Sequence, residues 1–127
     1  MANILLIEDD DQLRNLLELL LTSAGHVVTT AGEGAEGVKR FRANPADLVI
    51  TDIVMPNQEG IETIMKLRSQ HPRLGIIAMS GGANLSATWL AMAAKLGADR
   101  TLAKPFTILQ LNEAIAAVLA ARPAPPA

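Results

Sequence analysis

The sequence of 127 residues contains no cysteine. Disulfide bonds, thiolate nucleophiles and zinc–thiolate sites are therefore excluded, and we expect a cytoplasmic location, with which this absence is compatible. The 11 basic residues are outnumbered by 13 acidic ones and form no basic block. Direct binding to nucleic acid, which needs clustered positive charge, is therefore disfavoured. The amino terminus lacks the basic start of a cleavable signal peptide, so we expect none.

The chain has the apolar content of a folded domain, since half of its residues are hydrophobic. Residues 74–94 carry no charge, but the polar and flexible stretch 80–84 indicates a strand, a loop and a helix rather than a membrane span. We expect one domain over residues 1–121. Residues 122–127, with three prolines, are expected to form a flexible tail.

Short apolar runs alternate with segments of helical periodicity five times along the chain. Leu13, Leu16, Leu17 and Leu20, for example, have the spacing of a helix face that packs on a core. Short connections and right-handed crossovers then predict an α/β fold with a doubly wound, five-stranded parallel sheet. We expect a flavodoxin-like strand order, 2-1-3-4-5, in which the first and third strands are neighbours at the centre. The expected strands are 4–7, 26–30, 48–51, 76–79 and 100–102, and the expected helices are 11–24, 33–42, 60–70, 85–96 and 107–121.

Polar residues follow four of these apolar runs. Glu8 and Asp9 follow the first, Asp52 the third, Ser80 the fourth and Lys104 the fifth. Because the carboxyl ends of parallel strands open into one crevice, we expect carboxylates, a hydroxyl and an ammonium to meet there. Such a set suits a divalent cation and a phosphoryl group.

Each of these residues also has a purely structural interpretation. The acidic run 8–11 suits capping of a helix, for which we expect Asp10 or Asp11 to serve. Asp52 could cap the loop before Pro56, Ser80 could be a turn residue, and Lys104 could be an ordinary exposed lysine. The order of the four and their placement at strand ends favour the functional interpretation. An aspartate in so apolar a run is costly to bury unpaired, and a carboxylate can attack phosphorus to give an aspartyl phosphate.

The chain resembles the receiver domains of bacterial two-component response regulators over about residues 3–120. The resemblance lies in five motifs: Leu6-Ile7-Glu8-Asp9-Asp10, residues 47–56 around Asp52, Met79-Ser80-Gly81, Gly97-Ala98-Asp99 and Lys104-Pro105-Phe106. It implies a signalling switch rather than an enzyme, apart from its own phosphotransfer and autodephosphorylation.

By this resemblance Asp52 accepts the phosphoryl group from a sensor histidine kinase or a histidine phosphotransfer protein. Mg²⁺ would be bound by Asp9, Asp52 and the backbone carbonyl of Val54, with Glu8 acting largely through water. Ser80 would hold a phosphoryl oxygen and Lys104 would pair with the phosphate. The surface of the fourth helix, fifth strand and fifth helix would then change its affinity for a downstream protein, or for a second copy of the chain.

The sequence departs from many receivers at Thr101, where an aromatic residue usually accompanies activation by rotating inward. A tyrosine-type rotamer switch is therefore excluded. Trp89, expected on the fourth helix, is a candidate partner contact, although burial against the sheet is an equal alternative.

Two other functions compete with the phosphorylated switch. A haloacid-dehalogenase-like phosphatase usually places a second aspartate two positions after the nucleophile, where this chain has Val54. A receiver-fold scaffold that works without phosphorylation would not need all five polar site residues. If the chain is complete, we expect a stand-alone receiver or a phosphorelay intermediate; if it is part of a longer protein, the remainder determines the output.

Overall fold

In the computed structural model, five parallel strands form one sheet in the order β2-β1-β3-β4-β5. The structure describes residues 2–53, 59–81 and 86–121, and at residues 59 and 86–90 only the backbone. The strands are β1 (Asn3–Ile7), β2 (Val27–Ala31), β3 (Leu48–Asp52), β4 (Gly75–Gly81) and β5 (Arg100–Lys104). The helices are α1 (Asp11–Ser23), α2 (Gly34–Ala43), α3 (Glu59–Gln70), α4 (Ser86–Leu96) and α5 (Ile108–Ala121). The predicted flavodoxin-like α/β fold and its strand order are confirmed.

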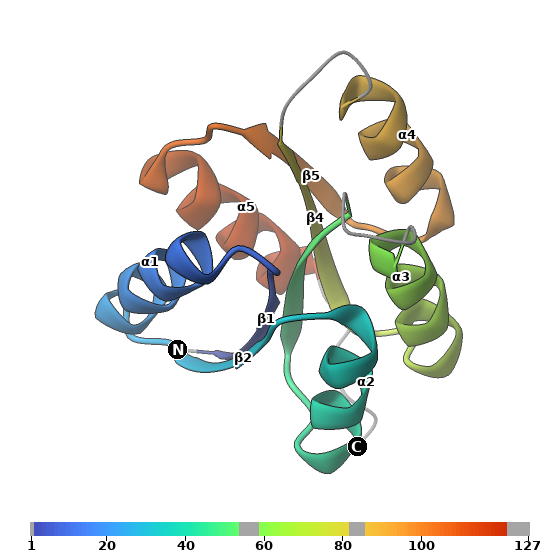
Figure 1. Ribbon diagram of the computed structural model, residues 1–127, viewed down its shortest axis with the longest axis horizontal. Coiled ribbons are helices and arrows are strands. Elements are labelled where there is room, and N and C mark those ends of the chain that lie inside the picture. Colours follow the sequence, from blue (N-terminus) through green and yellow to red (C-terminus); the bar gives the residue numbers. More distant parts are fainter. Residues whose placement is uncertain (1, 54–58, 82–85, 122–127) are drawn as a thin grey trace.

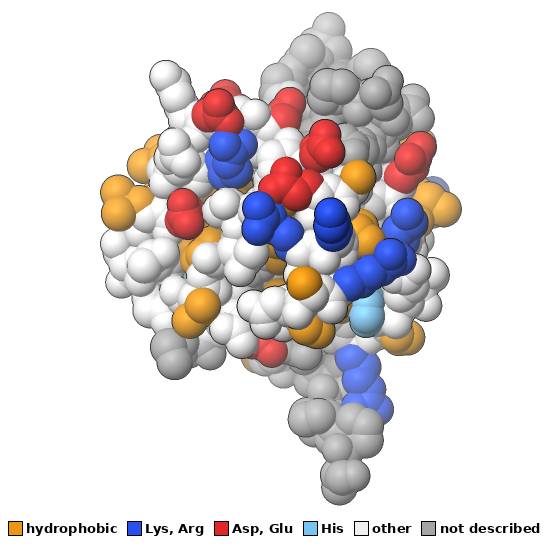
Figure 2. All heavy atoms as spheres, turned by 60° about the horizontal axis from the view of Figure 1, so that its bottom comes forward, with side chains coloured by type: hydrophobic (Ala, Val, Ile, Leu, Met, Phe, Trp, Pro, Cys, Tyr) orange, Lys and Arg blue, Asp and Glu red, His pale blue; other side chains and the backbone are white. Residues whose placement is uncertain are grey.

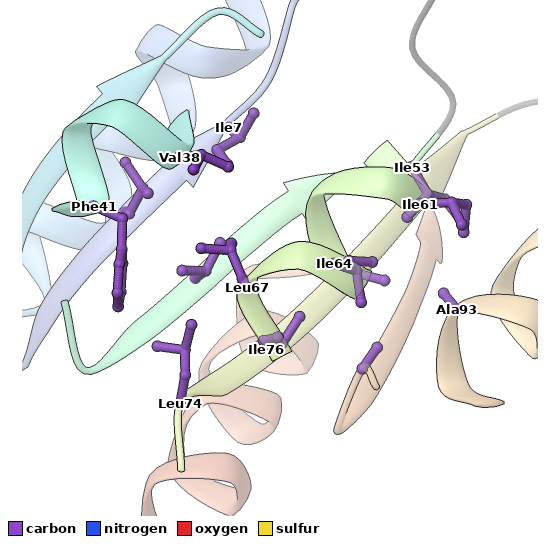
Figure 3. Packing of buried hydrophobic residues seen from close by; sticks show 14 of the residues in the cluster. Ile7, Val38, Phe41, Ile53, Ile61, Ile64, Leu67, Leu74, Ile76 and Ala93 are labelled. Carbon is purple, nitrogen blue, oxygen red and sulfur yellow. The ribbon is translucent and has the colours of Figure 1, made fainter. Parts of the chain in front are cut away.

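The helices cover both faces of the sheet, as Figure 1 shows, with α1 and α5 on one side and α2, α3 and α4 on the other. The buried residues accordingly form two clusters. One joins β1, β3 and β4 to the second group of helices and includes Phe41, Ile64 and Ile76, which Figure 3 shows converging on the sheet. The other packs Leu17, Leu21 and the apolar side of α5 on the opposite face. Burial on both faces explains why β3 and β4 are almost continuously apolar.

Several helix ends form as the sequence predicts. Asp10 caps α1 by accepting hydrogen bonds from the backbone nitrogens of Gln12 and Leu13 at 2.9 and 3.1 Å. Thr107 and Gln110 form a reciprocal capping box at α5, with distances of 2.8 and 3.0 Å. Gly25 and Gly97 end α1 and α4 with φ angles of +96° and +134°. That left-handed backbone is adopted readily only by glycine.

The predicted buried face of α1 is partly wrong. Leu16 is 51% exposed, whereas Leu17 and Leu21 are buried and Leu13 and Leu20 lie between these extremes. The leucines of this helix cover more than half of its circumference, so the sequence pattern did not single out the strip that the sheet covers. The buried line is set by the side on which the sheet lies.

Three strands extend further toward the candidate site than predicted. Asp52 is the last residue of β3, Ser80 lies inside β4, and Lys104 is the last residue of β5. These polar residues therefore belong to the sheet itself rather than to the loops that follow it. Strand pairing holds their backbones in register, which makes their side-chain positions better defined than loop positions.

On the face drawn in Figure 2, acidic and basic side chains are interspersed rather than gathered by sign. On α2, for instance, Arg40 pairs with Glu36 at 2.9 Å, one helical turn away. Among the described residues, no helix is long and apolar enough to cross a membrane. The predicted tail, residues 122–127, lies outside the described residues.

Candidate functional site

Three acidic side chains converge where β1 and β3 end. Glu8 follows β1 directly, Asp9 comes next, and Asp52 ends β3. The two strands are neighbours, with Ile7 paired to Thr51 in register. Each of the three carboxylates offers an oxygen within 4.8 Å of the others. Glu8 and Asp52 are buried, at 1% and 4% exposure, while Asp9 is exposed and forms the open side of the cluster.

The ammonium group of Lys104 binds two of these carboxylates. Its Nζ lies 2.6 Å from Oε1 of Glu8 and 2.6 Å from Oδ2 of Asp52. The side chain starts at the end of β5, two strands away from β3, and the peptide bond that follows, to Pro105, is cis. Both contacts are short charge-assisted hydrogen bonds. The predicted meeting of Lys104 with the acidic residues is thus present in the structure.

A single ammonium does not neutralise this cluster. Burial, opposed by the hydrogen bond from Lys104 and reinforced by the negative charge of Asp52, raises the pKa of Glu8 from 4.5 to about 7. Burial also disfavours the charged form of Lys104, but its hydrogen bonds to Asp52 and Glu8 outweigh that effect and raise its pKa. Glu8 is therefore held toward its neutral form mainly by burial, whereas Lys104 is held in its charged form by the two carboxylates that it contacts.

The loop that carries Glu8 is held by contacts that the sequence did not reveal. Arg14 on α1 donates from Nη1 to the backbone oxygen of Glu8 at 2.9 Å and also pairs with Asp11. The backbone nitrogen of Asp10 donates to Oε2 of Glu8 at 3.2 Å. On β3, Thr51 donates from Oγ1 to the backbone oxygen of Asp52 at 3.0 Å. The sequence shows only an arginine six residues after a strand-end acid, a spacing too common to indicate this contact.

Ser80 is fully buried in β4 and lies one residue beyond Met79, the register partner of Asp52. It therefore belongs to the same end of the sheet as the acidic cluster. Thr101 lies in β5, half-buried and paired with Ala78, three residues before Lys104. The backbone of Trp89 is part of α4, but its side chain, like the whole of Val54, lies outside the described residues. The structure does not test the roles predicted for Ser80, Thr101, Trp89 and Val54, which remain predictions.

The chemistry of this pocket favours a small, hard cation. Three carboxylates supply oxygen ligands, the negative charge exceeds the positive charge, and Asp9 keeps one side open to solvent. The acidic triad could therefore hold a metal ion, with Lys104 placed to contact a ligand of that ion. The same donor set leaves no thiolate or imidazole for a softer metal.

Comparison with known proteins agrees with this geometry. The family description "Response regulator receiver domain" matches residues 4–116 of the chain. The chain belongs to this family. It is 37% identical over 119 residues to the transcriptional regulatory protein AfsQ1 of Streptomyces coelicolor, covering 94% of this chain and 52% of that protein. It is 34% identical over 112 residues to the DNA-binding transcriptional regulator NtrC of Escherichia coli, covering 88% and 23%.

Solved receiver structures superimpose closely on this receiver domain. A receiver domain protein from Clostridium thermocellum has a TM-score of 0.85 and 31% identity, covering 94% of this chain and 95% of that one. A CheY-like receiver from Methanospirillum hungatei has a TM-score of 0.86 and 27% identity, covering 94% of both. The chain spans about half or less of the AfsQ1 and NtrC sequences. What it shares with those regulators is the receiver, a signalling module rather than a classical enzyme, whose family implies a histidine kinase partner.

Proposed function

We propose that the protein is a phosphorylatable switch that accepts a phosphoryl group on Asp52 in an Mg²⁺-dependent reaction. The observation that carries this proposal is the position of Asp52, which is buried beside Glu8 with the ammonium of Lys104 2.6 Å from its Oδ2. A carboxylate so placed has a nucleophilic oxygen, neighbouring metal ligands and a cation, which together are what phosphoryl transfer requires.

Each residue has a distinct part in the reaction. Glu8, Asp9 and Asp52 would hold the metal ion together with the carbonyl of Val54, and Glu8 would act largely through water. Mg²⁺, when bound, supplies positive charge to the phosphoryl oxygens. An oxygen of Asp52 attacks the phosphorus, the bond to the donor atom breaks, and the donor leaves with the bonding electron pair. Lys104 then pairs with the phosphoryl group instead of sharing its ammonium with Glu8.

The output follows from the added charge. Phosphorylation brings roughly two negative charges and several new hydrogen-bond acceptors to this end of the sheet. Ser80, buried in β4, would donate its hydroxyl to a phosphoryl oxygen and so alter the end of β4 and the helix α4 that follows. With a threonine at position 101, this shift works without an aromatic rotamer change. Phosphorylation thereby shifts the equilibrium between two conformations that already exist.

The partners proposed here follow from the family and from this switch. A sensor histidine kinase or a histidine phosphotransfer protein supplies the phosphoryl group. The surface of α4, β5 and α5, which carries the exposed Met92 and Leu109, binds a downstream protein or a second copy of the chain. A role as a phosphorelay intermediate uses the same chemistry at Asp52, with onward transfer in place of an output surface.

Intact-protein mass spectrometry after acetyl phosphate treatment tests the chemistry, with Mg²⁺ or EDTA present. The wild type is expected to gain one phosphoryl group with Mg²⁺ and none with EDTA, and Asp52→Asn none under either condition. Asp47→Asn is a matched control, because Asp47 precedes the opposite end of β3 and accepts a hydrogen bond from the backbone of Asn3 at 2.9 Å, which an amide oxygen can also accept. This control should be labelled like the wild type.

Two results would overturn the assignment. Equal labelling of Asp52→Asn and wild type would place the phosphoryl group on another residue. Failure of the folded wild type to accept a phosphoryl group, either from acetyl phosphate or from its kinase, would favour a scaffold that works without phosphorylation.

A further inference from the structure

Lys104 reaches the acidic cluster only by crossing a neighbouring strand. It ends β5, an edge strand, and β4 separates it from β3, which carries Asp52. Glu8 follows β1, one strand further still. Because adjacent strands lie about 4.8 Å apart, the lysine side chain must run over the end of β4 to make its two 2.6 Å contacts.

The residue that Lys104 crosses is Gly81. The two residues are register partners in the β4–β5 pair, so side chains at both positions would emerge on the same face of the sheet. A Cβ atom on Gly81 would lie 2.8 Å from Cδ of Lys104, 3.2 Å from its Cβ and 3.5 Å from its Cγ. The aliphatic part of Lys104 therefore occupies the space that a side chain at position 81 would fill.

We propose that Gly81 is a positioning residue for Lys104, because its lack of a side chain keeps open the path along which the ammonium reaches Glu8 as well as Asp52. The proposal rests on the proposed function, since Lys104 acts through the acidic pocket. A methyl group at position 81 requires a small shift of the flexible lysine. A branched side chain fills the path and directs the lysine away from the pocket. The contact with Glu8 is lost first, because Glu8 lies one strand further from β5 than Asp52 does.

Displacement of Lys104 has two consequences of opposite sign. The ammonium and a metal ion compete for the carboxylates of Glu8 and Asp52, so a displaced lysine leaves more uncompensated negative charge there for Mg²⁺. The phosphoryl group, by contrast, loses the cation with which it pairs. Mg²⁺ should bind more tightly while phosphoryl transfer becomes slower. General loosening of the site would weaken both.

A double-mutant cycle between Gly81→Val and Lys104→Met tests this inference. We expect Gly81→Val to tighten Mg²⁺ binding roughly fivefold in calorimetric titrations and to slow phosphorylation by acetyl phosphate roughly tenfold, with Gly81→Ala between it and the wild type. In the Lys104→Met background, which lacks the ammonium, Gly81→Val should change Mg²⁺ affinity by less than about twofold. Ala103→Val, an added branch at an exposed neighbouring position on β5, is the matched control and should match the wild type.

The two readouts separate the two proposals. Equal changes in Mg²⁺ affinity from Gly81→Val with and without Lys104 would overturn the role of Gly81, as would weaker binding together with slower transfer, even if the wild type is phosphorylated on Asp52. A coupled change in Mg²⁺ affinity in a chain that accepts no phosphoryl group would support that role while contradicting the proposed function. Thermal unfolding of each variant in EDTA verifies that the protein titrated is folded.

Discussion

The two ends of the sheet each hold a cationic side chain that joins several elements, but their charges balance differently. At the carboxyl end, Lys104 serves two buried carboxylates at once. At the amino end, Arg68 of α3 donates to the backbone oxygens of Gly97 and Pro72 and pairs with Asp99 at 2.9 Å. That carboxylate also accepts a hydrogen bond from the backbone nitrogen of Ile76 at 2.8 Å.

The Arg68 network is complete, whereas the Lys104 network is not. Arg68 meets one carboxylate and two carbonyls, so its charge is matched and all three of its nitrogens donate hydrogen bonds. Lys104 meets two carboxylates, with Asp9 close by, and burial, reinforced by the negative charge of Asp52, raises the pKa of Glu8. A balanced network holds elements together, and an unbalanced one is poised to receive a cation. Both networks therefore contribute to stability, and of the two the one at the carboxyl end could also hold a cation.

The largest expected effect that distinguishes the two networks is that of Lys104→Met. In EDTA at pH 8, this change leaves Glu8 and Asp52 without a cation and should lower the free energy of unfolding by about 3–5 kcal/mol. Saturating Mg²⁺ should restore most of the loss, because the metal ion replaces the missing charge. Urea denaturation with and without Mg²⁺ measures both quantities.

Lys66→Met is the control for loss of a lysine charge, because Lys66 is exposed on α3. It should change stability by less than about 0.5 kcal/mol. A destabilised Lys104→Met variant that Mg²⁺ does not rescue would contradict the view that the pocket is a cation site.

A second expected effect concerns pH. In the metal-free protein the pKa of Glu8 rises from 4.5 to about 7 on folding, so the folded state retains this proton over a range in which the unfolded chain has lost it. The contribution of Glu8 to the free energy of unfolding, in total roughly 3 kcal/mol, is therefore fully present below pH 4.5 and is lost as the pH rises to about 7.

Replacing Glu8 by glutamine removes this titration. Urea denaturation in EDTA at pH 5 and pH 8 should show a loss of stability with rising pH that is smaller in Glu8→Gln than in the wild type. The same difference between the two pH values in both proteins would argue that burial does not shift this carboxyl group.

The smallest of these effects is expected from Arg68→Met. The variant should lose about 2 kcal/mol, because water can reach the half-exposed Asp99 and satisfy part of what Arg68 leaves behind. Mg²⁺ should not restore this loss, and phosphorylation of Asp52 should continue. If Mg²⁺ restored the stability of Arg68→Met as completely as that of Lys104→Met, the two ends of the sheet would not differ in their response to a cation.

Much of the fold was predictable because its rules are local or depend on chain order. Alternating apolar runs and helical segments predicted a doubly wound parallel sheet, and the capping box at Thr107 and the helix-ending Gly25 are where they were expected. The exposure of Leu16 was not predictable. The leucines of α1 cover a broad arc, and only the position of the sheet decides which part of that arc is buried.

The residues of the candidate site likewise include some that the sequence predicts and some that it does not. Residues at strand ends, such as Glu8, Asp52 and Lys104, could be named from the sequence because parallel strands bring their carboxyl ends together. Arg14 and Gly81 could not, because each acts on a residue brought close by folding: Arg14 holds the carbonyl of Glu8, and Gly81 lies under the side chain of Lys104. No periodicity in the chain records such contacts.

The sequence by itself determined which chemical groups this receiver brings to one edge of its sheet, because the apolar runs mark where the strands end and parallel strands end at a common edge. Only the tertiary structure decided how their charges are shared. Desolvation of Glu8 and the reach of Lys104 across β4 depend on which atoms surround each group, and those neighbours come from segments distant along the chain.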